Sequence, residues 1–287
     1  MNDTSIQLTD VQQRFGRVVA LDGLSLTVRP GQLYGFLGRN GAGKTTTLRI
    51  LMGVLTAKSG TVEVLGQRVK KVPIELKRRI GYVSQEQYFY PWMTARQLGS
   101  FVSSFYPTWD EAEFTRLLVA LDVPPERRSV EMSGGTRTKL ALALALAPRP
   151  PLLLLDEPTS GLDPVARHEF NTLVSSMVKE RGTTVFFSSH LVDEVEDIST
   201  HVGIIDKGKL KVESELRVLL ASTRRVITAT PLALPEGFTR VRDNVWIAAP
   251  EAWTAAQWPE GVTLEPVSLH DLFLAYALPE QPRSTAA

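Results

Sequence analysis

The chain has 287 residues and 43% of them are hydrophobic, which is enough for one large core and a small appendage. Its 32 Lys and Arg residues balance 31 Asp and Glu residues, and the net charge of +1 gives no indication of a nucleic acid partner. The absence of cysteine excludes disulfides and thiolate metal sites, which fits a reducing cytoplasm, so a metal ion would need oxygen or imidazole ligands.

The ends and apolar runs of the chain indicate where it resides. The N-terminus, MNDTSIQLTD, is polar and lacks the basic start and apolar core of a secretion signal, so we expect the chain to stay in the cytosol. The longest apolar run, residues 140–147, is far shorter than the roughly 20 residues that span a bilayer. We therefore expect a chain that does not cross a membrane by itself.

The region before residue 86 predicts several strands and one helix. An apolar run at residues 33–38 enters a glycine-rich loop, and residues 44–55 leave that loop with helical spacing. A turn at residues 29–32 precedes this unit. The expected strands lie at residues 6–11, 25–28, 33–38, 61–66 and 79–85.

Residues 86–128 predict a helical insertion. Residues 94–97, TARQ, form a capping box, and Asp110 begins a second helix with leucines at helical spacing. After a third helix, the all-apolar strand at residues 151–158, PLLLLDEP, needs cover on both faces, as in a parallel sheet.

The following segment predicts a long helix, a strand and a hairpin. The helix has Asp163 as its N-cap, Pro164 at its first position and Gly182 as its C-cap. An apolar strand at residues 183–189 comes next, and residues 202–213 form the hairpin.

The composition shifts near Ser222. Three of the five tryptophans and several β-prone pieces lie beyond it, which predicts a small β-rich domain at residues 222–287, separate from a main domain at residues 1–221. The polar, proline-containing end, residues 279–287, predicts a disordered tail.

Residues 38–45, GRNGAGKT, match the glycine-rich phosphate loop, and they stand between a strand and a helix as its chemistry requires. The glycines let successive N–H groups converge on a phosphate, Lys44 can reach the β and γ oxygens, and Thr45 can hold Mg²⁺. This phosphate loop predicts nucleotide binding. The expected nucleotide-binding residues are Gly38, Asn40, Gly41, Ala42, Gly43, Lys44, Thr45 and Thr46.

Two adjacent acids end the apolar strand. Asp156 can hold Mg²⁺ directly or through water, and Glu157 can orient and deprotonate an attacking water. The alternative, a solvated turn, is disfavoured because ionised side chains seldom stand unpaired at a core edge.

A second glycine-bearing helix start, Ser133, Gly134 and Gly135, leads into an alanine-rich helix. Exposed backbone N–H groups at such a start can hold phosphate. The alternative is that Ser133 merely caps a core helix, since capping serines are common.

Taken together, these motifs resemble those of the ATP-binding-cassette ATPases that power membrane transporters. The resemblance runs from about residue 6 to about residue 220, and it is most specific at residues 133–164, where turn, helix, magnesium strand and following loop stand in order. It implies a P-loop NTPase α/β cassette with a mixed, mainly parallel core sheet, an antiparallel β subdomain and a helical subdomain at about residues 86–150.

The resemblance explains the two helix starts. In this family two cassettes pair head to tail, and the Ser133 turn of one closes on the γ-phosphate held by the Lys44 loop of the other. One chain then carries two half-sites, so we expect a second cassette, and the complete motif set permits a homodimer. ATP binding closes this dimer and hydrolysis reopens it.

Further roles carry over position by position. Gln85 matches a glutamine that senses Mg²⁺ and water, His190 a histidine that contacts the γ-phosphate, and Phe15 an aromatic that stacks on adenine. The alternatives are a core histidine and a core phenylalanine. Residues 160–163 resemble the loop that crosses the dimer interface.

The sequence departs from the family signature in one turn. Met132 and Thr136 stand where the family has leucine and glutamine. Met for Leu conserves packing, whereas Thr136 loses an amide worth about 1 kcal/mol as a hydrogen bond, so we expect slower or weaker closure without loss of activity.

Residues 86–93, EQYFYPWM, are unusually aromatic for a loop. In the family this region receives a short helix of the membrane subunit, so we expect permease docking at about residues 85–93. The alternative is that the aromatics pin the helical insertion to the core.

The predicted function is a Mg²⁺-dependent ATPase subunit of a membrane transporter, peripheral on the inner face of the cell membrane. The short cassette with its C-terminal extension looks most like the ATPases of bacterial two-component exporters of drugs, peptides or lipids. Two alternatives are a soluble cassette ATPase acting on ribosomes or DNA, which the near-neutral charge disfavours, and a nucleotide-dependent regulatory scaffold. The cargo is not encoded in these residues.

Overall fold

The computed structural model describes residues 4–228, 238–242, 245–248 and 262–277. Its centre is a six-stranded sheet in which β9, β3, β8, β7 and β6 run parallel and β10 pairs with β9 antiparallel. Across the sheet the strands are β10 (Lys209–Glu215), β9 (His201–Asp206), β3 (Leu33–Gly38), β8 (Thr184–Ser189), β7 (Leu152–Asp156) and β6 (Ile80–Val83).

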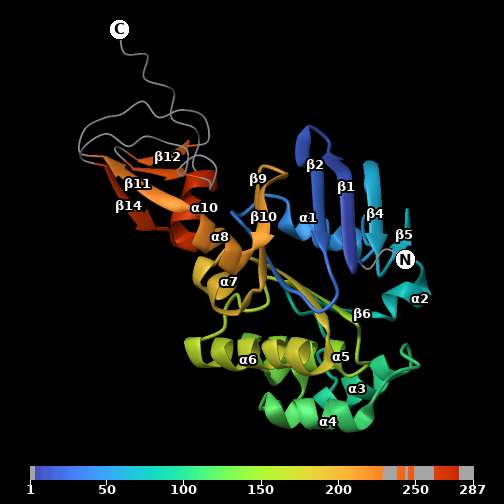
Figure 1. Ribbon diagram of the computed structural model, residues 1–287. Helices are drawn as coiled ribbons and strands as arrows, with labels where there is room; N and C mark the ends of the chain where they lie inside the picture. Colours follow the sequence, from blue (N-terminus) through green and yellow to red (C-terminus); the bar gives the residue numbers. More distant parts are fainter. Residues whose placement is uncertain (1–3, 229–237, 243–244, 249–261, 278–287) are drawn as a thin grey trace.

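A second, antiparallel sheet contains β2 (Val18–Val28), β1 (Ile6–Phe15), β4 (Ser59–Val64) and β5 (Gln67–Arg68). Helix α1 (Lys44–Leu51) lies between the two sheets, and the short α2 (Ile74–Lys77) precedes β6 (Figure 1). The strands β1 and β2 are longer than the sequence predicts. Bulges between them shift the register and break the alternation of polar and apolar residues that would have revealed their full length.

The two faces of the central sheet pack against different layers. Along β7, Leu152 and Leu154 face the core around α1, whereas Leu153 and Leu155 face the core formed with the helices. This alternation explains why the strand is apolar throughout, because successive side chains of a strand enter opposite faces and both are covered.

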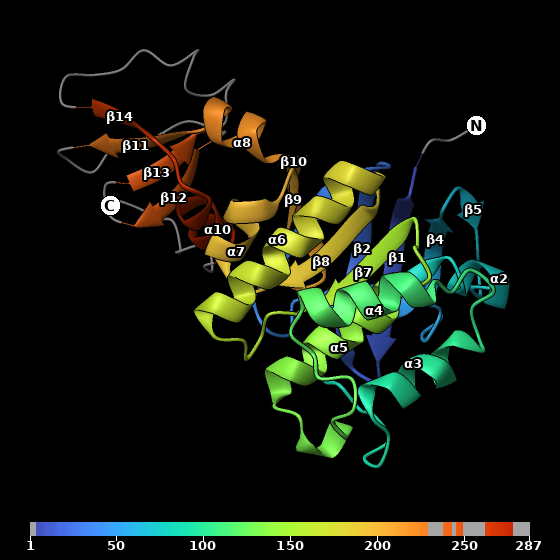
Figure 2. The same cartoon turned by 90° about the horizontal axis from the view of Figure 1, so that it is seen from below.

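The predicted helical insertion lies against one face of the sheet, with α3, α4 and α5 side by side (Figure 2). Thr94 and Gln97 form the predicted capping box, and Asp110 caps α4 as expected. The helical elements of this insertion are α3 (Ala95–Ser103), α4 (Glu111–Ala120), the 3₁₀ turn Ser129–Glu131 and α5 (Gly134–Leu146). The long helix α6 (Pro164–Arg181) follows β7.

The remaining elements form the C-terminal part of the chain. Helices α7 (Val192–Ile198) and α8 (Leu216–Ser222) lead to a four-stranded antiparallel sheet, and α10 (Leu269–Ala277) packs against α7 and β9 (Figure 1). In order, the strands of this sheet are β12 (Phe238–Arg242), β13 (Val245–Ala248), β11 (Arg224–Thr228) and β14 (Val262–Pro266). The predicted disordered tail lies outside the described residues.

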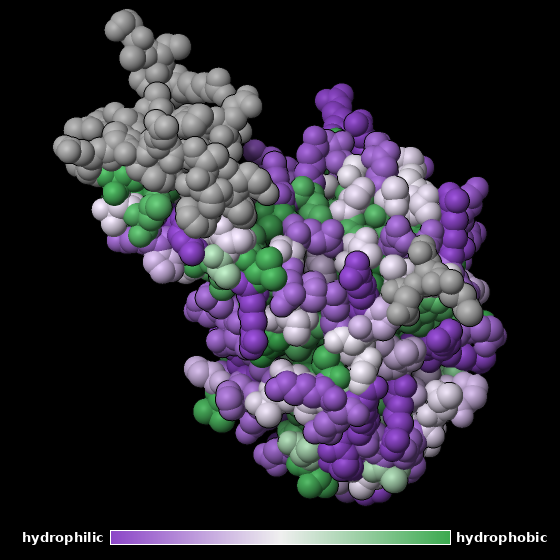
Figure 3. Space-filling model, viewed as in Figure 1, coloured by the Kyte–Doolittle hydropathy of each residue, from purple (hydrophilic) through white to green (hydrophobic). Residues whose placement is uncertain are grey.

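The surface in Figure 3 is mostly hydrophilic, and its hydrophobic residues form scattered groups. Within the described part of the chain, no helix combines the length and apolar character needed to cross a bilayer.

Candidate nucleotide site

The phosphate loop joins β3 to α1, and its glycines are required by the backbone. Gly43 has φ 114°, and a Cβ atom at this position would lie 2.7 Å from the carbonyl oxygen of Ala20. Gly41 also has a positive φ, 80°. The loop passes close to β2 at this point, so a side chain at Gly43 would collide with it.

Lys44 is buried at the start of this helix, with 4% of its surface exposed. Its ammonium donates to the carbonyl oxygens of Gly38 at 2.7 Å and Arg39 at 3.2 Å. It also pairs with Glu157 Oε1 at 3.0 Å. The lysine is therefore held within the loop by contacts with its own chain.

Asp156 ends β7 next to the loop. Its Oδ1 atom accepts from the hydroxyls of Thr45, at 3.1 Å, and Ser188, at 2.8 Å. Burial raises the pKa of the Asp156 carboxyl above its usual value, against the lowering effect of these two hydrogen bonds. Ser188 stands opposite Asp156 in the register of β7 and β8, and sequence reasoning missed it because register is a tertiary property.

Mg²⁺ is a hard cation that takes oxygen ligands, and the Thr45 hydroxyl and Asp156 carboxylate supply two of them side by side. Among the described residues, no group of three or more His, Asp or Glu side chains could hold a metal. The two oxygen donors fit Mg²⁺, which in nucleotide sites takes its other ligands from phosphate oxygens and water.

Glu157, the second residue of the acidic pair, contacts both sides of the site. Its backbone adopts a left-handed φ of 45°, which is uncommon for a non-glycine residue, and its N–H donates to the Ser188 hydroxyl at 3.0 Å. One carboxylate oxygen contacts Lys44, and the other lies 2.8 Å from His190 Nδ1. The solvated-turn alternative is therefore wrong, because this buried carboxylate joins the phosphate loop to the end of β8.

The predicted residues at the edge of the site are exposed. The His190 side chain is 38% exposed and bonded to Glu157, so it is not a core histidine. Phe15 is 47% exposed at the end of β1, which excludes the alternative of a core phenylalanine. Gln85 is exposed in the loop after β6, and Val83 of that strand pairs with Leu155, which places the loop beside Asp156.

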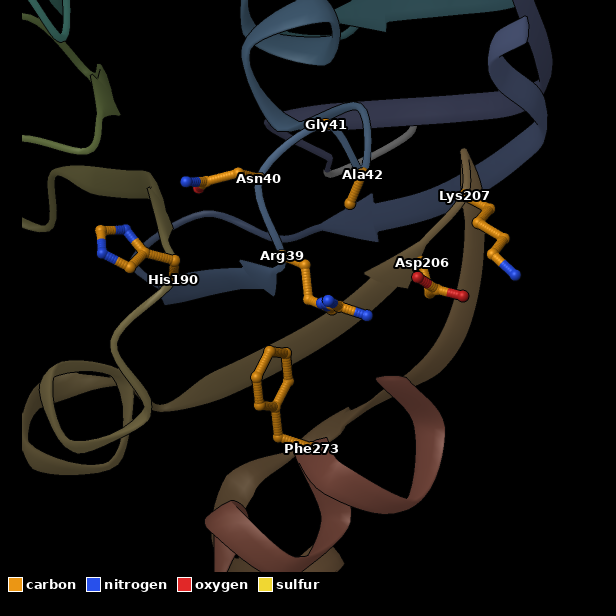
Figure 4. Close-up of a pocket in the computed structure, with 8 residues that line it drawn as sticks. All are labelled: Arg39, Asn40, Gly41, Ala42, His190, Asp206, Lys207 and Phe273. Atoms are coloured by element: carbon orange, nitrogen blue, oxygen red, sulfur yellow. The ribbon is translucent and has the colours of Figure 1, made fainter. Parts of the chain in front are cut away.

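A cavity of about 490 Å³ opens beside the phosphate loop. Figure 4 shows Asn40 and His190 on one side of it and the ring of Phe273 below Arg39. Phe273 belongs to α10, so the C-terminal part of the chain contributes a wall to this cavity. Sequence reasoning missed this residue, since no local motif connects a C-terminal helix with the phosphate loop.

The serine turn, residues 133–135, is separate from this cluster. The Ser133 hydroxyl accepts from Thr136 N–H at 3.1 Å, so it caps α5 as predicted. The turn is nevertheless open: Ser133 and Gly134 are exposed, and a Cβ atom built on Gly134 meets nothing within 4 Å. No hydrogen bond in the described part of the chain joins this turn to the phosphate loop.

The fold and the site define the class of protein: a P-loop nucleotide-binding cassette with a helical insertion. The family model described as "ABC transporter" matches residues 21–160, from β2 to the acidic pair. Two curated relatives extend the match. The bacitracin transport ATP-binding protein BcrA of Bacillus licheniformis is 39% identical over 212 residues, which cover 73% of this chain and 69% of that protein.

The Nod factor export ATP-binding protein I of Paraburkholderia xenovorans is 33% identical over 228 residues, 77% of this chain and 74% of that protein. In fold, the chain resembles the dimeric structure of MJ0796, a bacterial ABC transporter cassette, with a TM-score of 0.68, 24% identity and coverage of 74% of this chain and 99% of that one. The chain belongs to the family of ABC transporter ATP-binding proteins. Its relatives are named as transport and export ATP-binding proteins, which favours a transporter ATPase over the ribosome- or DNA-acting ATPase and the regulatory scaffold.

Proposed function

We propose that this chain is the ATP-hydrolysing subunit of an exporter, and that it works as a head-to-tail dimer beneath separate membrane subunits. The phosphate loop of each copy holds Mg²⁺ and ATP, and the serine turn of the other copy closes on the γ-phosphate. Export, as opposed to import, is supported by the relative named for Nod factor export, to which the chain is 33% identical.

The observation that carries this proposal is the contrast between Gly43 and Gly134. Gly43 is a glycine because its own chain leaves no room and imposes a positive φ. Gly134 has open space around its Cβ position and no positive φ, so no contact among the described residues explains it. Gly134 is the first residue of α5, and the close approach of a second molecule would account for a residue without a side chain there.

The contacts of Lys44, Glu157 and His190 support a route for ATP hydrolysis. Without nucleotide, Lys44 is neutralised by Glu157 at 3.0 Å, so phosphate oxygens must replace this carboxylate as the partner of the ammonium. Glu157, released from Lys44 but still beside His190, can then accept a proton from water that attacks the γ-phosphate. When bound, Mg²⁺ at Thr45 and Asp156 would neutralise charge on the phosphates.

The docking surface for a membrane subunit is an aromatic strip made of Tyr90, Trp92, Phe101 and Phe105. The rings touch in sequence, with centroids 5.3 to 5.7 Å apart, and all four side chains are exposed, Trp92 to 64%. Tyr88 is also exposed, whereas Phe89 packs against the core. An exposed aromatic strip supports docking of a partner helix, and Phe89 alone fits the alternative of pinning the insertion.

The decisive experiment uses Glu157→Gln in the full chain. This variant keeps the shape of the side chain but removes its basicity and its charge opposite Lys44, so hydrolysis is expected to fall by at least about 100-fold while ATP still binds. Light scattering with Mg·ATP should then show a stable dimer.

Lys44→Met in the same background is the control, because without the lysine the same conditions should leave a monomer. Wild-type turnover in Glu157→Gln would remove Glu157 from the role of base. A monomer at saturating Mg·ATP would overturn the head-to-tail dimer.

A further inference from the structure

A buried carboxylate that the proposed chemistry does not use lies behind the nucleotide site. Glu194, on the first turn of α7, is 3% exposed. Its Oε1 atom accepts from the Thr159 hydroxyl at 2.6 Å, and its Oε2 atom accepts from the Ser189 hydroxyl at 2.5 Å. Both donors are themselves buried, at 1% and 2% exposure. Both oxygens are therefore held by short, charge-assisted hydrogen bonds away from water.

The two donors belong to the two segments that form the site. Thr159 stands two residues after Glu157, and Ser189 directly precedes His190. Glu157 and His190 already touch at 2.8 Å, so Glu194 provides a second bridge between the same two segments, deeper in the protein. The Ser189 hydroxyl also accepts from the N–H of Leu191, which fixes the chain on the far side of His190.

Thr159 also begins the loop of residues 160–163. Its carbonyl oxygen accepts from Leu162 N–H at 3.0 Å, and Glu157 O accepts from Ser160 N–H at 3.1 Å. Clamping Thr159 therefore fixes the end of this loop, while Ser160 and Gly161 at its tip are exposed. Figure 4 shows the His190 side chain at the cavity beside the phosphate loop.

Placing a carboxylate at this buried position costs desolvation free energy. Burial raises the pKa of the Glu194 carboxyl, against the hydrogen bonds from Ser189 and Thr159 and the charge of Arg167 on α6, which lower it. Apolar residues of similar volume often replace buried ionic groups without loss of stability. What an apolar side chain cannot supply here is the simultaneous bond to two loops.

We propose that Glu194 is a positioning residue of the ATPase, which clamps the segment after Glu157 to the segment before His190, so that the loop of residues 160–163 moves together with His190. This inference rests on the proposed function, because the movement matters only if His190 and that loop respond to the γ-phosphate.

The test compares three variants of the full chain. Glu194→Ala removes the clamp. Glu194→Gln retains an oxygen for Thr159 and offers an N–H to Ser189. Glu196→Ala removes an exposed carboxylate from the same helix and is the matched control. Each is checked for folding by its melting temperature and for ATP affinity by titration.

We expect Glu194→Ala to lower kcat for ATP at least about tenfold with KM within about twofold, since positioning acts on the reacting state rather than on binding. Glu194→Gln should recover most of the rate, and Glu196→Ala should match the wild type. A kcat for Glu194→Ala within twofold of the wild type, or an equal loss in the Gln and Ala variants, would overturn the role.

Two measurements keep the test decisive. If Glu194→Ala does not fold, Thr159→Val, which removes one donor at nearly constant volume, should still lower kcat several-fold at constant KM, and an unchanged rate would refute the proposal. Hydrogen exchange in the nucleotide-free protein tests the clamp without hydrolysis: exchange at Ser160 and Leu162 should accelerate in Glu194→Ala and not in Glu196→Ala. Unchanged exchange overturns the clamp, whereas absence of wild-type hydrolysis overturns the proposed function.

Discussion

Two helices of this chain begin with glycines: α1 after the phosphate loop and α5 after the serine turn. Their local sequences are similar, but the first start is enclosed by the chain and the second is exposed. The phosphate loop is enclosed by its own chain: Lys44 is buried and paired with Glu157 at 3.0 Å, and Gly43 is forced by the nearby backbone of Ala20. The serine turn is capped by Ser133 but otherwise open. Asp156 and Glu157 lie beside the first helix start, whereas the second is open to solvent.

The difference shows that a helix N-terminus becomes a site through its neighbours. At α1 the neighbours are Asp156, Glu157 and His190, brought from β7 and β8 by the parallel register. At α5, in the proposed dimer, they would come from the second copy. Four substitutions test this comparison.

The largest effect is expected for Gly43→Ala. The added Cβ would lie 2.7 Å from the Ala20 carbonyl oxygen at a φ of 114°, which alanine rarely adopts. We expect a loss of stability of at least about 2 kcal/mol, together with loss of ATP binding. Thermal unfolding and nucleotide titration measure both. A variant with wild-type melting and affinity would show that the phosphate loop is not constrained by its own chain.

Gly134→Asp should leave stability and ATP binding intact and weaken the dimer. The new side chain enters open space, and an acid in the first helical turn is favourable for α5, so the melting temperature should stay the same or rise slightly. ATP binding to the monomer should be unchanged. In the Glu157→Gln background, however, the ATP-driven dimer should weaken at least about tenfold, because a carboxylate would face the triphosphate. An unaffected dimer would separate the serine turn from the interface.

Asp156→Asn tests whether the buried charge of Asp156 lowers the stability of the nucleotide-free protein. Both hydroxyl donors use Oδ1, which asparagine retains, so the substitution mainly removes the charge. Because the pKa of the folded Asp156 is raised, its ionisation costs stability as pH rises from the unfolded-state pKa through the folded one.

Nucleotide-free Asp156→Asn should therefore have a higher melting temperature than the wild type at neutral pH, by about 2–4 °C for each kcal/mol of unfolding free energy gained. This difference in melting temperature should disappear as the pH falls below the usual pKa range of an aspartate. A difference in melting temperature that grows as the pH falls would mean that the pKa of Asp156 is lowered in the folded protein. Loss of ATPase activity is expected at every pH, since Asn cannot replace a charged magnesium ligand.

The smallest effect is expected for Thr136→Gln, which restores the residue common in the family signature. Thr136 already bonds Ser133 through backbone and hydroxyl, so the amide adds on the order of one hydrogen bond, about 1 kcal/mol. Steady-state turnover should change by only a few-fold. A hundredfold increase would mean that Thr136 limits closure far more than its contacts indicate.

The sequence by itself determined the chemistry that depends on short windows. The phosphate loop, the acidic pair, the cap at Ser133 and the helix bounded by Asp163 and Gly182 all follow from local backbone requirements, and the structure has each of them in place. The family resemblance then supplied the functional roles that no local pattern gives.

Only the tertiary structure decided which of these elements meet. Three features join residues far apart in the chain: the pairing of Glu157 with both Lys44 and His190, the bridge through Glu194, and the wall that Phe273 gives to the cavity beside the phosphate loop. The physical reason is that local dihedral preferences and capping are settled within a few residues, whereas strand register and helix packing are set by burial of the whole core.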